Sequence, residues 1–301
     1  MTIMPEVSTM DILTSIEDMR KACVHARKRF GGRCKLGLVP TMGALHEGHL
    51  SLIRAAKREC DVVAVSIFVN PAQFAPGEDF ERYPRPMEQD CALLEAEEVD
   101  LLFAPSVREM YPHGAPQAFV DLPEIGGRLD GQFRSGHFRG VATVVAKLFH
   151  IVGPDLAFFG QKDAAQVAVL RAMVRELDFP LQMRVCPTVR EADGLALSSR
   201  NRYLTAEQRS DALALWRSLT AVRVLAEAGK SDTNALRHAM LCVLEASAGV
   251  RVEYADIVHP DTLLPLDHIG EGALVAVAAH VGTTRLIDNI LLPPAIEGSG
   301  R

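Results

Sequence analysis

Short apolar runs alternate with longer segments of helical periodicity through the first two-thirds of the chain. In the longer segments, apolar residues recur every three or four positions, which predicts helices at residues 15–30, 49–58, 87–98, 138–151 and 164–177. The short runs are rich in Val, Leu, Ile and Phe, which predicts buried strands at residues 35–39, 62–69, 101–103, 156–159 and 181–187. This alternation favours an α/β fold, a doubly wound parallel sheet with helices on both faces.

The pattern changes after about residue 188. Two helices are predicted at residues 206–228 and 234–248, and strands are predicted at residues 252–258, 274–279 and 283–287. Helices followed by strands predict a smaller α+β domain. We therefore expect two domains, residues 1–188 and 189–301, joined within residues 187–204.

Composition is typical of soluble globular proteins. Of the 301 residues, 48% are hydrophobic and 23% are charged, as in ordinary folded domains. The formal net charge is −6 and the lysines and arginines form no block, so no nucleic-acid partner is expected. The sequence has no run of about 20 apolar residues, which predicts that no segment spans a membrane.

The cysteines and the first twenty residues bear on the cellular compartment. The six cysteines are scattered and form no CxxC pair, which argues against a zinc knuckle and against a disulfide framework. Residues 1–20 include four acidic residues and no apolar segment of the kind found in secretory signal peptides. We therefore expect a cytoplasmic protein.

The sequence HEGH at residues 46–49 lies between a predicted strand and a predicted helix. In an open α/β sheet this edge is where ligands bind, and the free N–H groups at a helix start favour an anion such as phosphate. Gly43 and Gly48 permit a positive φ and a close backbone approach. The imidazoles of His46 and His49 are suited to donate to phosphate oxygens where negative charge develops.

Other interpretations of these histidines stay open. Histidines three residues apart are most often surface or core residues without chemistry. A metal pair is a further alternative, although HExxH metal motifs space their histidines four apart and the spacing here is three. The HxGH pattern after a strand is similar to that of nucleotidyl-transferring Rossmann-like enzymes, which bind ATP and release pyrophosphate.

Two polar segments elsewhere have both a functional and a structural interpretation. Gln73 offers donors and acceptors to a small polar substrate, unless Asn70 and the proline after it only form a turn. Ser198, Ser199 and Arg200 form a donor cluster suited to close over a triphosphate and stabilise transferring charge. The alternative is a solvated interdomain turn.

A third polar segment follows the predicted strand at residues 156–159. Gly160 lets the backbone turn, and Lys162 is long enough to reach a phosphate as a point charge. Asp163 either caps the next helix or contacts the nucleotide or a metal, and Gln166 lies one helical turn further on. Lysines at strand ends are usually solvated, so a functional role for this segment is supported only by its occurrence together with HEGH.

Five segments resemble the pantothenate synthetase (pantoate–β-alanine ligase) family, within the HxGH nucleotidyltransferase-like superfamily. They occur in order over roughly residues 12–292, and they are PTMGALHEGH at 40–49, SIFVNP at 66–71, FFGQKD at 158–163, PTVREADGLALSSRNRYL at 187–204 and GTTRLIDN at 282–289. The resemblance implies a Rossmann-like N-terminal domain, a smaller C-terminal domain and a homodimer.

The resemblance also implies a two-step ligation. ATP and pantoate give an enzyme-bound pantoyl adenylate and pyrophosphate, and magnesium accompanies the ATP. The amine of β-alanine then attacks the adenylate and gives pantothenate and AMP. This chemistry belongs to coenzyme A biosynthesis.

Site residues follow from the resemblance by position. Catalytic roles fall on His49, which matches the histidine assigned as proton donor, and on His46 and Lys162. The positions that bind pantoate and β-alanine are Gln73, Gln166, Asn70, Arg134 and His137. The ATP-binding positions are Met42, Gly43, Ala44, Leu45, His46, Glu47, Gly48, His49, Gly160, Gln161, Lys162, Asp163, Val189, Leu197, Ser198, Ser199 and Arg200. No metal ligand is assigned.

The chain departs from the family pattern at several positions. Gln161 stands where many members carry glutamate, and Ala164 and Ala165 replace a bulkier pair before Gln166. Leu197 stands where methionine is common, which conserves volume. Residues 86–90 include fewer acidic residues than in some relatives, so the magnesium ligands stay unassigned.

Three other functions stay open on sequence alone. A different HxGH adenylyl transferase would activate another acid. An aminoacyl-tRNA synthetase would carry a basic tRNA-binding extension, and the sequence has no such basic segment. An ATP-binding regulatory module would keep the nucleotide contacts without the chemistry.

Overall fold

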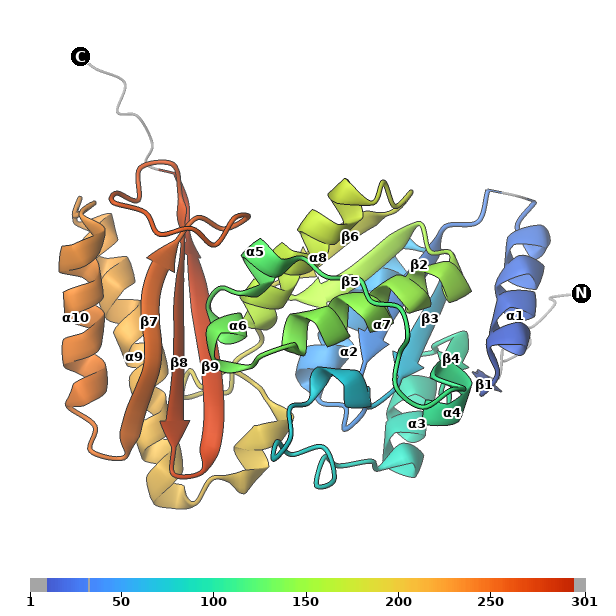
Figure 1. Cartoon of the computed structure of the whole chain (residues 1–301), viewed down its shortest axis with the longest axis horizontal. Coiled ribbons are helices and arrows are strands. Elements are labelled where there is room, and N and C mark those ends of the chain that lie inside the picture. The colour runs from blue at the N-terminus through green and yellow to red at the C-terminus, as the bar shows by residue number, and fades with distance from the viewer. Residues whose placement is uncertain (1–9, 32, 295–301) are drawn as a thin grey trace, which may run out of the picture. The chain divides into compact units, whose positions relative to one another are not determined.

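The computed structural model describes residues 10–31 and 33–294. The described residues form two compact units, each drawn from several stretches of the chain (Figure 1). Unit 1 lies within Met1–Leu122, Arg134–Gly160 and Met173–Cys186, and unit 2 lies within Pro123–Phe133, Gln161–Ala172 and Pro187–Arg301. Residues 1–9, which are part of the stretch used for the compartment prediction, lie outside the described residues.

Unit 1 is built on a six-stranded parallel sheet with the strand order β1-β4-β3-β2-β5-β6. Its strands are β1 (Asp11–Leu13), β2 (Leu36–Thr41), β3 (Val62–Ile67), β4 (Leu101–Phe103), β5 (Leu156–Gly160) and β6 (Gln182–Cys186). The four inner strands are buried on both faces, which explains their continuous apolar runs. Since β3 and β5 flank β2, the strand order reverses beside β2. Open α/β sheets bind ligands at the carboxyl ends of the strands around such a reversal.

Helices cover the parallel sheet on both faces. They are α1 (Ile16–Arg29), α2 (Glu47–Glu59), α3 (Met87–Ala96), α4 (Val107–Met110) and α7 (His137–Val152). Helix α2 contacts β2, β3 and β5, whereas α1 packs against α7, which in turn contacts β2. The crossover from β2 to β3 runs across the sheet in the opposite direction from those that lead from β1 to β2 and from β4 to β5. Right-handed crossovers of opposite direction place their helices on opposite faces, α2 on one and α1 and α7 on the other. The predicted doubly wound α/β architecture is therefore confirmed.

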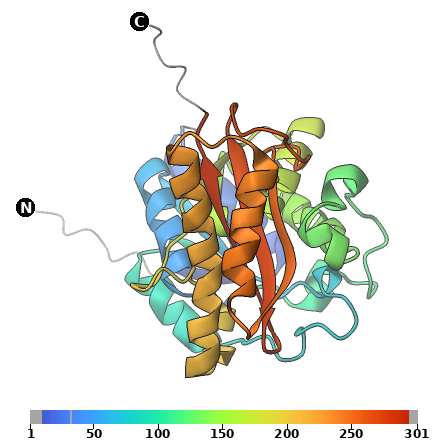
Figure 2. The same cartoon turned by 90° about the vertical axis from the view of Figure 1, so that its left-hand side faces the viewer.

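Unit 2 is built on an antiparallel sheet of β7 (Val250–Val258), β8 (Ala273–Val281) and β9 (Thr284–Leu292), with β8 in the middle. Helices α9 (Ala206–Glu227) and α10 (Thr233–Glu245) lie side by side over one face of this sheet (Figure 2). Buried apolar side chains fill the space between the helices and the sheet, among them Leu215, Leu219, Leu236, Met240, Val275 and Val277. This arrangement confirms the predicted smaller α+β part.

Several short elements complete the two units. Unit 1 contains the 3₁₀ helix η1 (Pro71–Gln73). Unit 2 contains α5 (Pro123–Gly126), α6 (Asp130–Phe133), η2 (Gln161–Asp163) and η3 (Ser199–Tyr203). Helix α8 (Ala164–Glu176) begins in unit 2 and ends in unit 1.

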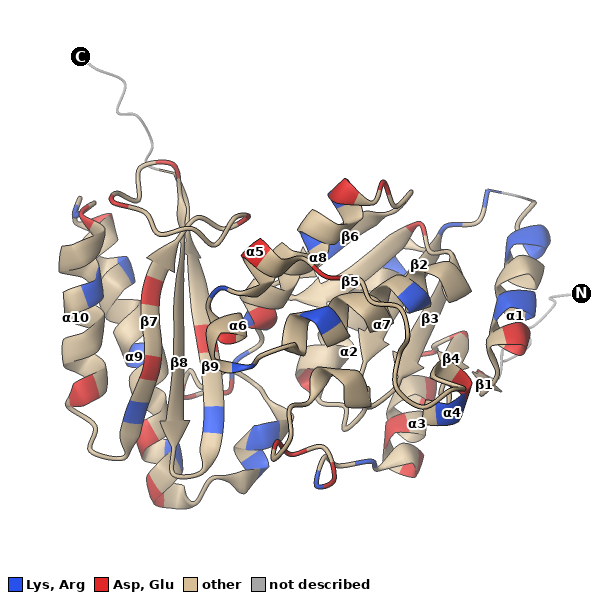
Figure 3. Ribbon diagram, viewed as in Figure 1, with Lys and Arg blue, Asp and Glu red and all other residues tan. Residues whose placement is uncertain are grey.

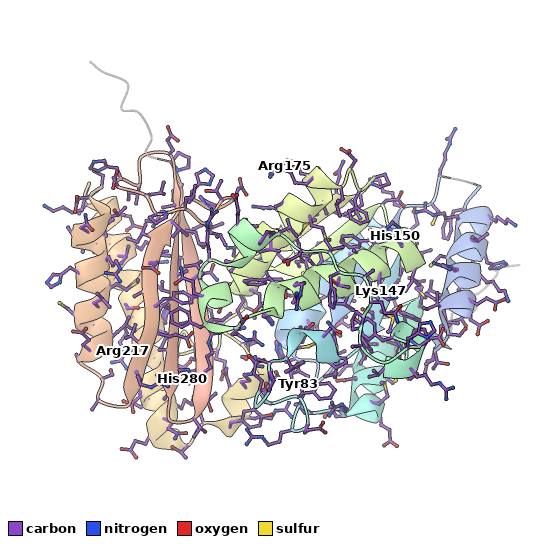
Figure 4. All side chains as sticks on the ribbon, viewed as in Figure 1. Tyr83, Lys147, His150, Arg175, Arg217 and His280 are labelled. Atoms are coloured by element: carbon purple, nitrogen blue, oxygen red, sulfur yellow. The ribbon has the colours of Figure 1, made fainter. Side chains whose placement is uncertain are left out.

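Buried charges hold α6 to the sheet of unit 2. Arg285 on β9 donates to Asp130 at 2.7 Å and to Glu253 at 2.8 Å. The Tyr254 hydroxyl donates to Asp130 at 3.1 Å. His280, near the end of β8 (Figure 4), lies 3.4 Å from Glu253. These contacts explain why α6, which precedes a helix of unit 1 in the chain, belongs to unit 2.

Acidic and basic residues are interspersed along the helices and strands of both units (Figure 3). Helix α1 begins with Glu17 and Asp18 and ends with Arg27, Lys28 and Arg29, an order that complements the helix dipole. No helix in the described part of the chain is long and apolar enough to cross a bilayer.

The structure differs from the sequence prediction at a few boundaries. Strand β9 ends at Leu292, five residues beyond the predicted end at residue 287, because the buried polar pair Asp288 and Asn289 interrupts its apolar pattern. The sequence does not predict β1 and α4 to α6, which span only three or four residues each and are too short for periodicity. The domain boundary at residue 188 stays a prediction, since unit 2 also draws on earlier stretches of the chain.

Candidate active site

The two histidines of HEGH hold the first turn of α2. His46 is the N-cap residue, and its Nδ1 atom accepts a hydrogen bond from the backbone N–H of Gly48 at 3.1 Å. The Nδ1 atom of His49 accepts from the backbone N–H of His46 at 3.3 Å, and the two rings lie 4.1 Å apart. Because each Nδ1 accepts, each neutral ring carries its hydrogen on Nε2. Each imidazole is thus an N–H donor, which its predicted role requires.

A buried carboxylate holds the loop before α2. Asp90 on α3 is 1% exposed, and it accepts from the backbone N–H groups of Ala44 and Leu45, each at 2.8 Å. Gly43 has a φ of +80°, which confirms the left-handed conformation predicted there. The same prediction for Gly48 is wrong, because Gly48 lies in the first turn of α2.

Glu47 directs its carboxylate along the surface of α2. It forms an ion pair with Arg54, whose Nε atom also donates to Glu97 at 3.0 Å. All three groups lie within unit 1. The side chain of Glu47 is therefore engaged in an ion pair on the surface of α2. The ATP contact predicted at Glu47 stays a prediction.

Gln73 lies in a buried hydrogen-bond network. The side chain is 8% exposed, and its Nε2 atom lies 2.9 Å from the sulfur of Met42. The Nδ2 atom of Asn70 donates to Gln73 Oε1 and to the carbonyl of Gly140, both at 3.1 Å. The Oδ1 atom of Asn70 accepts from the backbone N–H of Ala72 at 3.2 Å and from the Tyr111 hydroxyl at 2.8 Å. All four hydrogen-bonding positions of the Asn70 amide are therefore used within unit 1, where they orient Gln73.

Tyr111 is a fixed donor in this network. Burial raises the pKa of its hydroxyl to about 12, so the group keeps its proton at neutral pH. A retained proton commits the hydroxyl to donate to Asn70 Oδ1. Consequently the amide of Asn70 cannot flip without losing this bond.

Helix α7 approaches η1 so closely that only glycine fits at position 140. A Cβ atom on Gly140 would lie 2.2 Å from the carbonyl oxygen of Ala72 and 2.7 Å from the Cα atom of Gln73. Real Cβ atoms essentially never approach other atoms this closely. The backbone of Gln73 therefore packs directly against α7.

His137 contacts Gln73, and Arg134 contacts His137. The Nδ1 atom of His137 lies 2.8 Å from the carbonyl oxygen of Gln73, and its Nε2 atom lies 2.9 Å from a guanidinium nitrogen of Arg134. Because a guanidinium only donates, Nε2 accepts and Nδ1–H donates to Gln73. Arg134 donates two more hydrogen bonds to Glu78, at 2.8 and 2.7 Å. The structure thus brings the predicted substrate residues of unit 1 together around Gln73.

The Glu78–Arg134 pair predicts a pH-dependent stability. Burial alone raises the pKa of Glu78, but the hydrogen bonds and charge of Arg134 outweigh it, and the pKa lies below its ordinary value of 4.5. A carboxyl group with a lowered pKa stabilises the fold above its unfolded pKa, and this contribution is lost as the pH falls through the folded pKa. Wild type should therefore keep its stability advantage over Glu78→Gln from about pH 7 to about pH 5 and lose it on further acidification to about pH 3.

Urea unfolding midpoints of both proteins across this range measure the effect. Glu245→Gln is the matched control, because it makes the same change at an exposed position of α10. A difference between wild type and Glu78→Gln that stays constant with pH would contradict the prediction.

In unit 2, Asn289 on β9 holds the stretch Gln161–Asp163. Its Nδ2 atom donates to the carbonyl oxygens of Gln161 at 3.0 Å and Lys162 at 2.9 Å. Its Oδ1 atom accepts from Gln161 Nε2 at 3.0 Å. The ammonium of Lys162 lies 3.4 Å from Asp163 Oδ1. A single buried amide thus fixes the backbone carbonyl groups of Gln161 and Lys162.

A buried ion pair precedes Asn289 on the same strand. Arg190 donates to the two carboxylate oxygens of Asp288 at 2.6 and 2.8 Å, and its guanidinium lies 3.8 Å from the centre of the Trp216 ring. Burial raises the pKa of Asp288, and the charge of Arg190 opposes that rise. Arg190 belongs to a tight hairpin in which Leu197 N–H donates to the Val189 carbonyl at 3.0 Å. The hairpin places two predicted ATP-binding positions opposite each other.

The other predicted positions of unit 2 lie at the 3₁₀ helix η3 and at the start of α8. The Oγ atom of Ser198 caps η3 and accepts from the N–H of Arg200 at 3.3 Å. Gln166 lies in the first turn of α8 and is half-buried.

Gly160, the last residue of β5, does not have the predicted role of a turn. It pairs with Cys186 in the sheet and has no positive φ. A Cβ atom at this position would meet nothing within 4 Å, so the glycine leaves open space at the strand end.

Similarity to known proteins identifies the family of this chain. The sequence profile of pantoate-beta-alanine ligases matches residues 11–291. The chain is 58% identical over 286 residues to the pantothenate synthetase of Acidobacterium capsulatum, a match that covers 92% of this chain and 95% of that protein. The chain belongs to the pantoate-beta-alanine ligase family. A second relative, the pantothenate synthetase of Koribacter versatilis, is 52% identical over 97% of this chain and 99% of its own length.

Solved structures of pantoate-beta-alanine ligases share this fold. The pantothenate synthetase of Thermus thermophilus matches with a TM-score of 0.87 at 48% identity, over 95% of this chain and all of that one. The ligase of Francisella tularensis, complexed with beta-gamma ATP and beta-alanine, matches with a TM-score of 0.75 at 35% identity, over 94% of this chain and 97% of that one. Membership of the family assigns to this chain the ATP-dependent condensation of pantoate with β-alanine.

The residues that support the candidate site are not evident from the sequence. Asp90 and Tyr111 lie more than 40 residues along the chain from the groups they bind, and no spacing rule links them. Gly140 did carry a signal, since a glycine within an apolar helix lowers helix propensity and often marks close packing. Asp288 and Asn289 carried another, as a polar pair in an otherwise apolar strand.

Proposed function

We propose that this ligase forms a pantoyl adenylate from ATP and pantoate and then transfers the pantoyl group to β-alanine. The observation that carries the proposal is the pair of imidazole donors, His46 and His49, at the carboxyl end of the central strand β2. The start of a helix favours phosphate. Donors fixed there stabilise the charge that develops on pyrophosphate.

In the first step, a carboxylate oxygen of pantoate attacks the α-phosphorus of ATP. A new P–O bond forms and the bond to pyrophosphate breaks, so no protein nucleophile is needed. The protein has to hold two anions together and neutralise the charge on the leaving group. That task falls on donor and cationic side chains, His46, His49, Lys162, Ser198, Ser199 and Arg200.

The proposed ATP contacts come from segments that follow strands of the parallel sheet. They are residues 42–49, Gly160 with residues 161–163, Val189 and residues 197–200. The buried Asp90 carboxylate supports the first segment, because it fixes two of its backbone N–H groups. The Asn289 amide supports the segment at 161–163 in the same way.

Gln73 and Gln166 are the proposed pantoate ligands. Uncharged amides bind hydroxyl groups and a carboxylate without adding net charge. Asn70, Arg134 and His137 are predicted substrate residues whose side chains contact Gln73 or its neighbours. We assign them a positioning role that acts through Gln73.

In the second step, the amine of β-alanine attacks the acyl carbon of the adenylate. A C–N bond forms, the C–O bond to AMP breaks and the amine loses a proton. AMP is a good leaving group, so an uncharged amine suffices. Gln73 lies beside the amine in this proposal, and exclusion of water protects the adenylate from hydrolysis.

Magnesium and the homodimer remain parts of the proposal. Among the described residues, no three His, Cys, Asp or Glu side chains are grouped so that they could hold a metal ion. Mg²⁺ is commonly bound by one or two carboxylates together with substrate phosphates. We therefore propose that it arrives with ATP, where it offsets phosphate charge, and we name no protein ligand. We also propose that the protein is a homodimer, and the mass of the protein in solution from sedimentation equilibrium tests this.

Gln73→Ala and Gln166→Ala are each expected to raise the KM for pantoate about ten-fold or more, or to abolish turnover. Each change removes an amide and leaves a polar substrate group without its partner, which is costly in a desolvated site. Initial rates of AMP formation at varied pantoate measure the effect.

Gln117→Ala controls for the same truncation at an exposed position. Unchanged pantoate kinetics in both variants would count against pantoate as the ligand of these glutamines and favour another acid.

A product assay tests the overall reaction. The chain is incubated with ATP, magnesium, pantoate and β-alanine, and the products are identified by mass spectrometry. The proposal predicts AMP and pantothenate in equal amounts, only when every substrate is present. AMP formed with a different acid would favour another adenylyl transferase, whereas ATP binding without any product would favour a regulatory module.

A further inference from the structure

Two neighbouring side chains on β9 connect two proposed ATP-binding segments of unit 2. Asn289 holds the stretch Gln161–Asp163 through three hydrogen bonds of 2.9–3.0 Å. Asp288 holds the hairpin of residues 189–197 through its two hydrogen bonds from Arg190. Both residues are 4% exposed. The two segments are therefore fixed to adjacent positions of one strand.

The orientation of the Asn289 amide is determined by its partners. Two of them are backbone carbonyl oxygens, which only accept, so Nδ2 must face them. The third is Gln161 Nε2, which donates to Oδ1. Reversal of the amide would replace three hydrogen bonds by repulsive contacts. This geometry holds one conformation of the backbone that carries Lys162.

The ion pair beside Asn289 fixes its backbone in turn. The carboxylate of Asp288 accepts from the N–H of Asn289 at 2.7 Å, and Arg190 lies 3.3 Å from the carbonyl oxygen of Asn289. Arg190 is itself held in place by the Trp216 ring and by the carbonyl of Gly194 at 3.1 Å. The arrangement is preorganised, because every member has a buried or stacked partner.

We propose that Asp288 and Asn289 are positioning residues that fix the spacing between the Gln161–Asp163 segment and the 189–197 hairpin for binding of ATP. The residues act through the backbone of Lys162 and through Arg190. The inference rests on the proposed function, because it takes both segments to contact ATP. It adds that ATP affinity depends on side chains of β9 that are buried beneath those segments.

The test is ATP binding to Asn289→Asp, measured by calorimetry with magnesium and without pantoate. The substitution keeps the shape of the side chain but turns a carboxylate toward two carbonyl oxygens. We expect the Kd for ATP to rise about ten-fold, because a displacement of about 1 Å is enough to disrupt aligned contacts. The KM for pantoate in the product assay should change much less.

Two controls separate positioning from general damage. Asn234→Asp makes the same chemical change at an exposed position of α10, and it should bind ATP like wild type. Trp216 is the single tryptophan of the chain, so its emission reports whether the Arg190 stack survives. Unchanged emission in Asn289→Asp would show that the fold around the ion pair is intact.

Asn289→Ala covers the case in which the buried charge prevents folding. It removes the same hydrogen bonds without adding a charge, and the same loss of ATP affinity is expected. Wild-type ATP affinity in a folded variant would overturn the inference, and so would an equal loss of ATP and pantoate binding. If wild type binds ATP but makes no pantothenate, the proposed function fails while the effect of Asn289 on ATP binding can still be measured.

Discussion

Replacement of His49 by alanine is expected to slow adenylate formation at least ~100-fold. Loss of one donor aimed at developing transition-state charge costs about 10²–10³ in kcat. The Nε2–H group of His49 is such a donor in our account, because its Nδ1 atom already accepts from His46 at 3.3 Å. The rate of pyrophosphate release in a single turnover with ATP and pantoate, without β-alanine, measures this step. Lys162→Ala is expected to cause a loss of the same size.

A second substitution separates the chemistry of His49 from its role in the helix cap. Asparagine places an acceptor near the position of Nδ1, so His49→Asn retains the hydrogen bond from His46 but loses the outer donor. We expect His49→Asn to be as slow as His49→Ala. His25→Ala removes an exposed imidazole from α1 and serves as the control. A wild-type rate in either His49 variant would refute the catalytic role.

Gly140→Ala is expected to lower kcat/KM about 100-fold and to destabilise the protein by about 1–3 kcal/mol. The added Cβ would lie 2.2 Å from the Ala72 carbonyl, whereas ordinary contacts begin near 3.4 Å. Segment η1 must therefore move by about 1 Å, a displacement that costs about 10² in rate when it misplaces a substrate-binding group. Overpacking of this kind costs about 1–3 kcal/mol.

Gly270→Ala is the matched control for Gly140→Ala. Position 270 has no positive φ, and a Cβ atom there meets nothing within 4 Å. Pantoate kinetics and urea unfolding of both variants measure the two effects. Gly140→Ala with wild-type kinetics would show that the function of Gln73 does not depend on its close packing against α7. That result would contradict the arrangement described above.

The fold was predictable because its core strands are buried on both faces. Strands that are buried at every position, such as Val62–Ile67, need cover on both faces, and the alternating helices supply that cover. Strand β9 was harder to predict. Its buried Asp288 and Asn289 resemble loop residues by type, and only their partners Arg190 and Gln161 make burial favourable.

The candidate site was predictable only where its chemistry is local in sequence. HEGH follows β2 and the Lys162 segment follows β5, so the position of each segment after a strand could be inferred from the chain. The supporting groups could not, because Asp90 reaches Ala44 across 46 positions of sequence. The role of a glycine was also ambiguous from the sequence. Gly43 turns the backbone with a φ of +80°, whereas Gly140 allows a neighbouring backbone to pack closely.

Exchange of labelled pyrophosphate into ATP tests the central claim most directly. The assay contains magnesium and omits β-alanine, so it isolates the first step. The account predicts exchange that requires pantoate, which would establish acyl-adenylate chemistry and the acid together. Exchange that needs a different acid, or no exchange with any acid from folded protein that binds ATP, would contradict it.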